Sequence, residues 1–258
     1  MTETRPESGV LRGRVALVTG VSRPSGIAVA VARRLHELGA TVRATGWPPH
    51  DAEMTWGAAE LGELDFPVGH HDFAEPDVPA RVIDEVVAAH GRLDIVAAVH
   101  ARSSTAGFDT VDALELDRCW AVNVRSIVLL AQRFGAVHSP SPTGEPPVGR
   151  MLWFTSGQHR APMDDEIAYA VSKGALHQMT ASVDHALARS RIVANCINPG
   201  PVDTGWADTD LHATVAERFP DGRWTTPAEV AELVGFLVSD AGALVRGQVI
   251  DAEAGFTR

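Results

Sequence analysis

A tyrosine and a lysine lie four residues apart in this chain, and the sequence contains no second residue of either type. They are Tyr169 and Lys173, and the other 21 basic residues are arginine. Residues four apart lie on the same face of a helix. Arginine cannot replace lysine where a compact ammonium is needed or where a proton has to leave. The pair therefore predicts a site in which a phenol and an ammonium act together on a proton.

A serine and an asparagine have positions that suit the same site. Ser156 lies 13 residues before Tyr169 and directly follows an apolar segment, 151–155. If that segment is a parallel strand, the hydroxyl lies at its carboxyl end, where open α/β sheets bind ligands. Asn123 lies in the apolar segment 120–124, where it is either a satisfied buried amide or part of the site. Ser156 alone would serve equally well as a strand-end cap, so the prediction depends on the four residues together.

A glycine-rich turn follows the first predicted strand, 14–18, and leads directly into a predicted helix, 26–38. Glycine lets the backbone turn tightly and approach a ligand, and a helix N-terminus offers unpaired N–H groups to a phosphate. The turn departs from the usual dinucleotide fingerprint, because Ala28 occupies the third glycine position and the first two glycines are widely spaced. A purely structural turn is the alternative. The residues that we expect to contact a cofactor here are Gly20, Ser22, Arg23, Gly26 and Ile27.

The residues after the second predicted strand, 41–45, bear on the choice between NAD and NADP. A carboxylate at that point would bond the ribose 2′-hydroxyl of NAD, and the segment Thr45-Gly46-Trp47 has none. Arg23 is available to a 2′-phosphate, unless it is only a solvated loop charge. The sequence therefore favours NADP(H), with NAD(H) as the alternative.

No metal site and no disulfide framework are predicted. The adjacent His70 and His71 have no partners at a metal-ligand spacing, so we expect surface histidines. The two cysteines, Cys119 and Cys196, are expected to be reduced thiols in the core. Asp72, at the end of the third predicted strand, either accepts from an adenine amino group or begins a turn.

These motifs resemble those of the short-chain dehydrogenase/reductase family over residues 11–256. The resemblance rests on Thr19-Gly20, Asn123-Val124, Ser156, Tyr169-x-x-x-Lys173, Asn198-Pro199-Gly200 with Thr204, and Gly247-Gln248-Val249-Ile250. The Ser156-Gly157-Gln158 start and the long glycine-rich turn are similar to a bacterial branch labelled 3-oxoacyl-carrier-protein reductase-like. The family usually has Asn-Asn-Ala-Gly where this chain has Ala98-Val99-His100-Ala101. We expect His100 to be a packed histidine, with contact to substrate as the alternative.

The resemblance implies an oxidoreductase that transfers a hydride between a nicotinamide cofactor and a carbonyl or alcohol. Tyr169 would be the general acid in reduction and the base in oxidation, and Ser156 would hydrogen-bond the carbonyl oxygen. Lys173 would lower the tyrosine pKa, ordinarily about 10, and hold the nicotinamide ribose. Asn123 would hold a backbone bend or a water that links Lys173 to solvent. The further cofactor contacts would be Trp47, Asp72, Phe73, Ala98, Tyr169, Lys173, Pro199, Gly200, Val202 and Thr204. The substrate pocket would draw on Ser103, Gln158, His159, Met163 and Trp206.

The elements that must position these residues alternate between strand and helix along the chain. Several predicted strands are continuous apolar runs, as expected for strands buried on both faces. The pattern predicts an α/β fold with a single Rossmann-type, doubly wound parallel sheet and helices on both faces. The resemblance implies about seven strands in the order 3-2-1-4-5-6-7. The later strands are predicted at 66–72, 93–99, 151–155, 192–197 and 247–250, and the later helices at 76–90, 114–137, 167–189, within 206–224, and at 226–238.

The domain organisation is predicted to be simple. Residues 1–12 form a polar, mobile arm, and 13–258 form one domain with a proline-rich loop at 138–149 and a substrate lid around 205–225. Apolar residues on more than one face of helices 114–137 and 167–189 predict a homo-oligomer, most simply a tetramer.

Charge and composition exclude several classes of function. The net charge is −11 and no cluster of arginines is present, which argues against a nucleic-acid or anionic-membrane surface. No apolar run approaches the roughly 18 residues of a membrane span, and the N-terminus lacks the apolar core of a secretory signal. We therefore predict a cytoplasmic enzyme with a small-molecule substrate, and acidic carrier-protein substrates are disfavoured. The alternatives are a non-catalytic dinucleotide-binding sensor and an epimerase or dehydratase with the same fold.

Overall fold

Seven parallel strands form one sheet in the predicted order, β3-β2-β1-β4-β5-β6-β7. The computed structural model describes residues 9–138 and 149–257. The strands are β1 (Val15–Thr19), β2 (Thr41–Gly46), β3 (Val68–His70), β4 (Ile95–Ala98), β5 (Gly149–Phe154), β6 (Ile192–Asn198) and β7 (Val249–Asp251). The chain winds outward from β1 to β3 and then resumes at β4 on the other side of β1. The crevice for a ligand is therefore expected at the carboxyl ends of β1 and β4.

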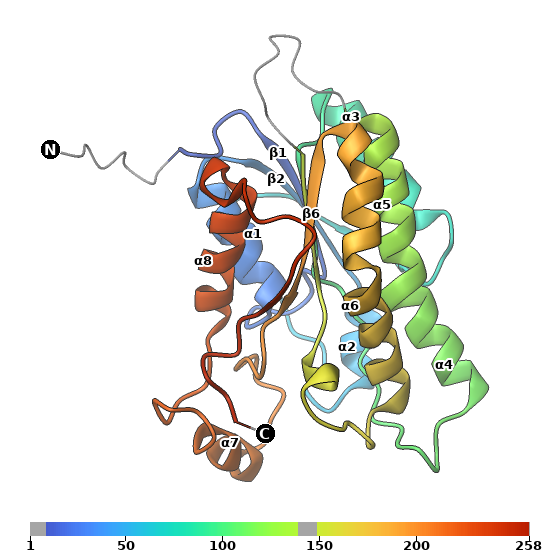
Figure 1. The fold of residues 1–258 in the computed structure, drawn as a ribbon, viewed down its shortest axis with the longest axis vertical. Helices are drawn as coiled ribbons and strands as arrows, with labels where there is room; N and C mark the ends of the chain where they lie inside the picture. Colours follow the sequence, from blue (N-terminus) through green and yellow to red (C-terminus); the bar gives the residue numbers. More distant parts are fainter. Residues whose placement is uncertain (1–8, 139–148, 258) are drawn as a thin grey trace, which may run out of the picture.

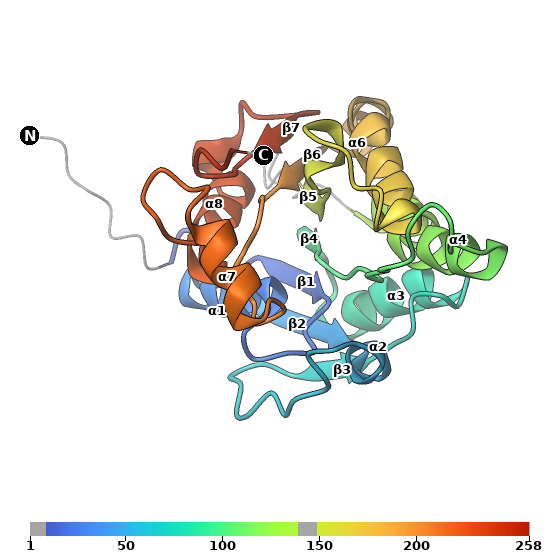
Figure 2. The same ribbon diagram turned by 90° about the horizontal axis from the view of Figure 1, so that it is seen from below.

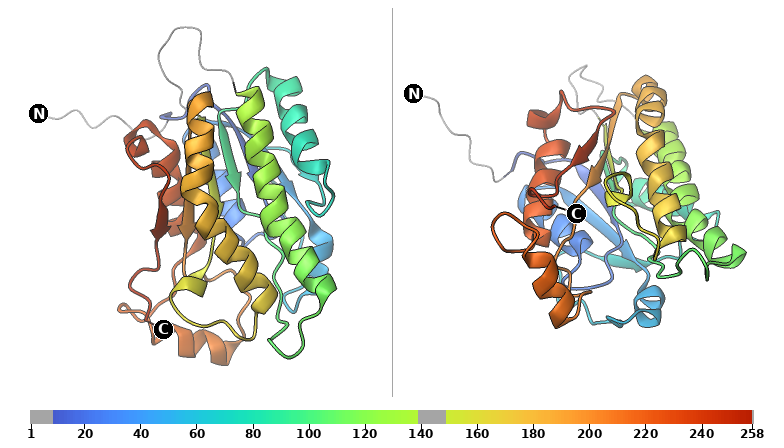
Figure 3. Two further views of the ribbon diagram at one scale, coloured as in Figure 1. Left: turned by 45° about the vertical axis from the view of Figure 1, so that its right-hand side comes forward. Right: turned by 60° about the horizontal axis from the view of Figure 1, so that its bottom comes forward.

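Helices cover both faces of the sheet (Figures 1 and 2). One face carries α1 (Ile27–Glu37) and α8 (Pro227–Val238), and the other carries α3 (Val78–His90), α5 (Ser126–Val137) and α6 (Ile167–Leu187). Figure 3 shows α5 and α6 side by side on the second face. Successive strand residues point into the hydrophobic cores on opposite faces of the sheet. Val18 packs in the core on the α1 side, and Leu17 packs in the core on the α6 side. This double burial explains why the strands are continuous apolar runs.

The predicted helix 114–137 is a continuous helical run, but its middle is a π-helix. It consists of α4 (Ala113–Cys119), a π-helical segment (Trp120–Arg125) and α5. π-Helical turns are rare and occur often at functional sites. Asn123 lies within this turn, fully buried. The apolar spacing of the sequence does not distinguish this turn from a regular α-helix.

Three other segments differ from the predictions. The segment after β2 begins a helix that we did not predict, α2 (Pro48–Glu53), because the first turn of a helix needs no N–H donors and tolerates proline. β3 is shorter than the predicted 66–72. Leu11, assigned to the mobile arm, is fully buried, and its N–H donates to the Leu38 carbonyl at 2.9 Å. The rest of the predicted arm and loop, 1–8 and 139–148, lies outside the described residues.

The predicted lid has a small core of its own. It contains α7 (Thr209–Ala216), followed by Phe219 and Trp224, which are buried together. The Trp224 ring stacks on His212 and meets Trp206 edge-on. These contacts make the lid a packed unit at the carboxyl edge of the sheet (Figure 2). In the part of the chain that the structure describes, no helix is both long enough and apolar enough to cross a membrane.

Candidate active site

Ser156, Tyr169 and Lys173 come together where β5 ends and α6 begins. The Tyr169 and Ser156 side chains are hydrogen-bonded to each other. The Lys173 Nζ atom lies 5.4 Å from the centre of the Tyr169 ring and donates to the Phe154 carbonyl at 2.8 Å. Since Phe154 is the last residue of β5, the ammonium is fixed to the strand that leads to Ser156.

Burial controls the protonation of the tyrosine and the lysine. Burial raises the pKa of Tyr169 above its usual value, the nearby Glu166 carboxylate adds to the rise, and the bond to Ser156 opposes it. Burial lowers the pKa of Lys173 to about 8. The expected lowering of the tyrosine pKa is therefore wrong for this structure, because the loss of hydration outweighs an ammonium held on the Phe154 carbonyl. Tyr169 is a protonated phenol at neutral pH.

Asn123 holds the loop after β4 against α6. Its Oδ1 accepts from the Arg102 N–H at 2.6 Å, and its Nδ2 donates to the Arg102 carbonyl at 3.0 Å. The same Nδ2 donates to the Ser172 hydroxyl at 2.8 Å, and that hydroxyl donates to the Tyr169 carbonyl at 2.7 Å. Asn123 is thus a satisfied buried amide, and it also connects the loop to the helical turn that carries Tyr169.

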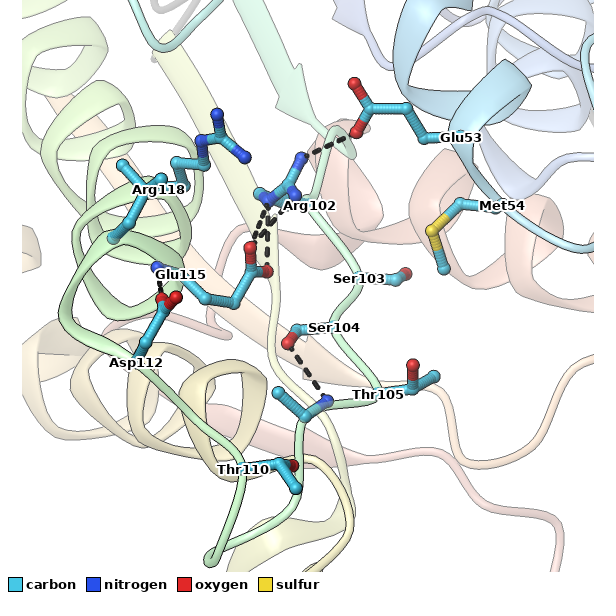
Figure 4. Close-up of a pocket in the computed structure, with 12 residues that line it drawn as sticks. Glu53, Met54, Arg102, Ser103, Ser104, Thr105, Thr110, Asp112, Glu115 and Arg118 are labelled. Atoms are coloured by element: carbon cyan, nitrogen blue, oxygen red, sulfur yellow. Dashed lines mark hydrogen bonds and ion pairs between the residues drawn. The ribbon is translucent and has the colours of Figure 1, made fainter.

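The Arg102 side chain fixes the same loop from the outside (Figure 4). Its guanidinium lies 3.0 Å from a Glu115 carboxylate oxygen on α4 and 3.3 Å from a Glu53 oxygen on α2. A pocket of about 330 Å³ opens beside these ion pairs. Four hydroxyl side chains contribute to its lining, from Ser103, Ser104, Thr105 and Thr110. The predicted substrate residue Ser103 therefore lines a polar pocket next to the loop that Asn123 holds.

The turn after β1 has the geometry of a phosphate site. Gly20 has φ +86°, and a Cβ there would lie 2.7 Å from the His100 backbone nitrogen, so only glycine fits. Gly26 precedes α1 without a side-chain cap, and the first turn from Ile27 carries no acidic residue. The first N–H groups of α1 are therefore available to an anion, while the Ser22 N–H donates to the Gly20 carbonyl. The pyrophosphate of a nicotinamide dinucleotide fits this turn.

Arg23 is held next to a carboxylate that the sequence did not reveal. Its Nε lies 3.3 Å from Asp51 Oδ1, and its guanidinium carbon lies 4.8 Å from the centre of the Trp56 ring. Thr45, Gly46 and Trp47 indeed supply no carboxylate, but α2 supplies one a few residues later. Arg23 is thus a partly buried, paired arginine and not the solvated loop charge that was the alternative.

His100 lies between β1 and α5 and is hydrogen-bonded to both. Its Nδ1 lies 2.5 Å from the Thr19 hydroxyl, and its Nε2 lies 2.8 Å from the Ser126 hydroxyl. The ring stacks on Phe73 with centroids 4.0 Å apart. Burial lowers the pKa of His100 to about 3, so the ring is neutral. The histidine therefore connects β1 to α5, which is the packed arrangement that we predicted.

The other predicted cofactor residues lie at the carboxyl ends of the strands. Trp47 is 38% exposed beside β2, and Ala98 is the buried last residue of β4. Asp72 Oδ1 accepts from the Ala74 N–H at 2.8 Å, as in a turn that an aspartate begins. The loop after β6 carries Pro199, Gly200, Val202 and Thr204.

Asn198, the last residue of β6, braces that loop. Its Nδ2 donates to Asp251 at 2.7 Å and to Glu253 at 2.8 Å, and its Oδ1 accepts from the Gly200 N–H. Across the crevice, the Thr204 carbonyl accepts from the Ser25 hydroxyl at 2.8 Å. The glycine-rich turn and the loop after β6 therefore face each other.

Two residues predicted to contact substrate have other partners. His159 Nε2 lies 3.0 Å from an Asp251 oxygen, and its ring packs on His177. Gln158 turns back onto the strand end, where its Nε2 donates to the Thr155 hydroxyl and its Oε1 accepts from the Ser156 N–H. We therefore omit His159 from the proposed substrate site and assign Gln158 to the support of Ser156.

Two further residues predicted to contact substrate, Trp206 and Met163, lie beside the crevice. Trp206 belongs to the predicted lid segment, donates from its indole N–H to the Val202 carbonyl at 3.2 Å and packs on the Trp224 ring. The Met163 carbonyl accepts from the Glu166 N–H, which shapes the segment before α6. Both positions are compatible with a wall of the substrate site.

Sequence reasoning missed four side chains at this site. They are Asp51, Trp56, Arg102 and Glu166, and each lies outside the helices and strands that we predicted. Glu166 alone gave a signal, because it lies one helical turn before Tyr169. The other three act through pairings between distant segments, which no local pattern records.

Comparisons with known proteins place this site in a family. A family model described as enoyl-(acyl carrier protein) reductase matches residues 20–257. The uncharacterized oxidoreductase YjdA of Bacillus subtilis is 32% identical over 254 residues, which cover 95% of this chain and 97% of that protein. An NADPH-dependent aldehyde reductase-like protein of Arabidopsis thaliana is 31% identical, with 95% of each chain covered. A short chain dehydrogenase of Burkholderia cenocepacia, solved in complex with NADP, has a TM-score of 0.79 at 27% identity, with 95% of this chain and 98% of that chain covered.

The chain belongs to the short-chain dehydrogenase/reductase family. It is therefore an oxidoreductase with a Rossmann-type fold that binds a nicotinamide dinucleotide. The reductase-like branch named from the sequence is consistent with these matches.

Proposed function

We propose that this protein is an NADP(H)-dependent carbonyl reductase of the short-chain type, acting on a small ketone or aldehyde. The observation that carries the proposal is the set of Ser156, Tyr169, Lys173 and Asn123, joined at the carboxyl edge of the sheet beside an uncapped helix N-terminus. The phenol is protonated at neutral pH and can supply the proton that reduction of a carbonyl requires.

In the proposed mechanism the chain supplies the proton and the orientation. A bound nicotinamide cofactor supplies the hydride. Tyr169 donates its proton to the carbonyl oxygen, and Ser156 donates a hydrogen bond to the same oxygen as negative charge develops on it. Lys173, whose ammonium already bonds the Phe154 carbonyl, holds the nicotinamide ribose and keeps a positive charge near the phenol. Asn123 keeps the Tyr169 turn aligned with the loop after β4.

NADP(H) is the proposed cofactor. The partly buried Arg23 beside the phosphate turn suits a 2′-phosphate. An Arabidopsis relative is described as NADPH-dependent and a Burkholderia relative was solved with NADP, which supports the same choice. Binding would use the N–H groups of α1 for the pyrophosphate, and Thr204 together with Gly200 on the nicotinamide side.

The proposed function is tested with purified protein, NADPH and a panel of small ketones and aldehydes. We expect loss of NADPH absorbance with at least one carbonyl compound and formation of the matching alcohol. A sensor would bind the cofactor without consuming it, and an epimerase or dehydratase would convert substrate with no net change in NADPH. Either result would contradict the proposal.

We further propose that the chain assembles as a homo-oligomer, most simply a tetramer. The outer surface of α4, the π-helical turn, α5 and α6 exposes large apolar side chains, which are Leu114, Leu116, Trp120, Val128 and Val171. Exposed apolar side chains on adjoining helices favour burial against a second copy, as a two-fold axis would provide.

Light scattering coupled to size exclusion should therefore give a mass that is a multiple of 27.5 kDa. Trp120→Glu should shift the protein toward smaller species, because it places a charge in the apolar surface. Leu211→Glu on α7 is the matched control and should leave the mass unchanged, since Leu211 is similarly exposed but distant in the fold. A single species of 27.5 kDa for the unaltered chain at micromolar concentration would refute the assembly.

A further inference from the structure

The carboxyl end of β2 has no room for a side chain. An ideal Cβ at Gly46 would lie 2.0 Å from the carbonyl oxygen of Val21, a separation that atoms cannot adopt. The glycine-rich turn therefore packs directly on the strand end, and the Val21 N–H also donates to the Thr45 carbonyl at 2.9 Å. Gly46 therefore supplies no side chain to the ribose 2′ position.

α2 brings a carboxylate to this place. Asp51 is only 5% exposed. Its Oδ1 accepts from the Trp56 indole N–H at 3.0 Å and lies 3.3 Å from Arg23 Nε. Its Oδ2 is buried and has no hydrogen-bond partner among residues 9–138 and 149–257. A buried carboxylate oxygen without a partner costs free energy, so it is a candidate acceptor for a ligand hydroxyl.

Arg23 is also held by groups other than Asp51. Its two terminal nitrogens donate to the Thr204 carbonyl at 3.2 Å and to the Thr204 hydroxyl at 3.3 Å, and its guanidinium lies over the Trp56 ring. Burial lowers the pKa of Arg23 and Asp51 opposes this shift, so the aspartate is the counter-charge of the guanidinium. Loss of the Asp51 charge would leave the arginine in place but unpaired.

We propose that Asp51 sets the cofactor specificity of this enzyme, by pairing with Arg23 and by offering its free oxygen to a ribose 2′-hydroxyl. A 2′-phosphate is attracted by Arg23 and repelled by the aspartate beside it. A 2′-hydroxyl needs no cation and gains an acceptor. Asp51 therefore reduces the difference in binding affinity between NADPH and NADH, so that the protein still binds NADH. This inference rests on the proposed cofactor and concerns one residue of its site.

The test is calorimetric titration of NADPH and NADH into the unaltered protein and into Asp51→Asn. Asparagine keeps the shape of the side chain and can accept from Trp56, but it removes the charge. The ratio of the NADH Kd to the NADPH Kd should rise about tenfold or more, because a charge a few Å away across a partly buried site changes binding strongly. Asp51→Glu should keep the ratio near that of the unaltered protein. Asp77→Asn removes a carboxylate whose side chain is 67% exposed at the start of α3, and it should change nothing.

A second measurement isolates the 2′ position. Adenosine 2′,5′-bisphosphate and AMP differ there by one phosphate. In Asp51→Asn the ratio of the AMP Kd to the bisphosphate Kd should rise by the same factor of about ten or more. If Asp51→Asn does not fold, Asp51→Ser provides the neutral side chain. A ratio that stays the same or falls in the neutral variants overturns the role of Asp51 and leaves the proposed function standing. Failure of both cofactors to bind the unaltered protein overturns the two together.

Discussion

Replacing Tyr169 with phenylalanine is expected to lower kcat for carbonyl reduction by a factor of about 10² or more. The substitution removes one oxygen atom, and general acid catalysis typically contributes this much to a rate. The phenol is a protonated hydroxyl that interacts with Ser156 from a fixed position on α6. Steady-state rates with NADPH and the best carbonyl compound of the panel give the measurement.

Two controls separate lost chemistry from lost structure in the Tyr169→Phe variant. The melting temperature should stay close to that of the unaltered protein, because the ring that Lys173 faces remains in place. The Kd for NADPH should change by no more than a few-fold, since the phosphate turn precedes α1 and the phenol would be one of many expected contacts to the cofactor. A kcat within threefold of the unaltered enzyme would exclude Tyr169 as the proton donor.

The sheet and the catalytic residues could be predicted because both depend on patterns along the chain. Strands buried on two faces are mostly apolar along their length, so β1, β4 and β6 are recognisable one by one. The Tyr169 and Lys173 pair is recognisable because one helical turn separates two residue types that the chain uses nowhere else. Parallel order then brings Ser156 to the same edge as that pair.

The remaining features depend on contacts between segments that are distant in the sequence. Asp51 lies in a helix that begins with two prolines, and nothing local indicates that its carboxylate reaches Arg23. Arg102 belongs to no recognisable sequence motif. Its backbone is held by hydrogen bonds from the Asn123 side chain, which lies 21 residues further along the chain. The π-helical turn at Asn123 likewise has ordinary apolar spacing.

The structure differs most from our expectation in the protonation of Tyr169. The spacing of Tyr169 and Lys173 suggested an ammonium that lowers the phenol pKa, but spacing says nothing about hydration. In the folded chain burial raises the pKa of Tyr169 and lowers that of Lys173 to about 8, so each group is driven toward its neutral form. A neutral phenol is the correct form for reduction, whereas oxidation of an alcohol would require its proton to leave first. The protonated phenol can therefore serve as the proposed proton donor at neutral pH.

Lys173→Arg is expected to lower kcat by a factor of about 10² or more, although it keeps the positive charge. Lys173 is 2% exposed and its Nζ bonds the Phe154 carbonyl at 2.8 Å, so the wider, planar guanidinium cannot take the same position.

The pH profile of the Lys173→Arg variant gives a second readout. With the pKa of Lys173 near 8, the unaltered enzyme should lose activity as the pH rises above about 8 and the ammonium loses its proton, whereas the residual activity of the arginine variant should show no such fall. Lys173→Met is the companion variant if the arginine disturbs packing. Because burial disfavours the ammonium in the folded state, the methionine variant should melt no lower than the unaltered protein at neutral pH while remaining inactive. A kcat for Lys173→Arg within about threefold of the unaltered enzyme would show that charge alone suffices at this position, and the need for a compact ammonium on the Phe154 carbonyl would have to be abandoned.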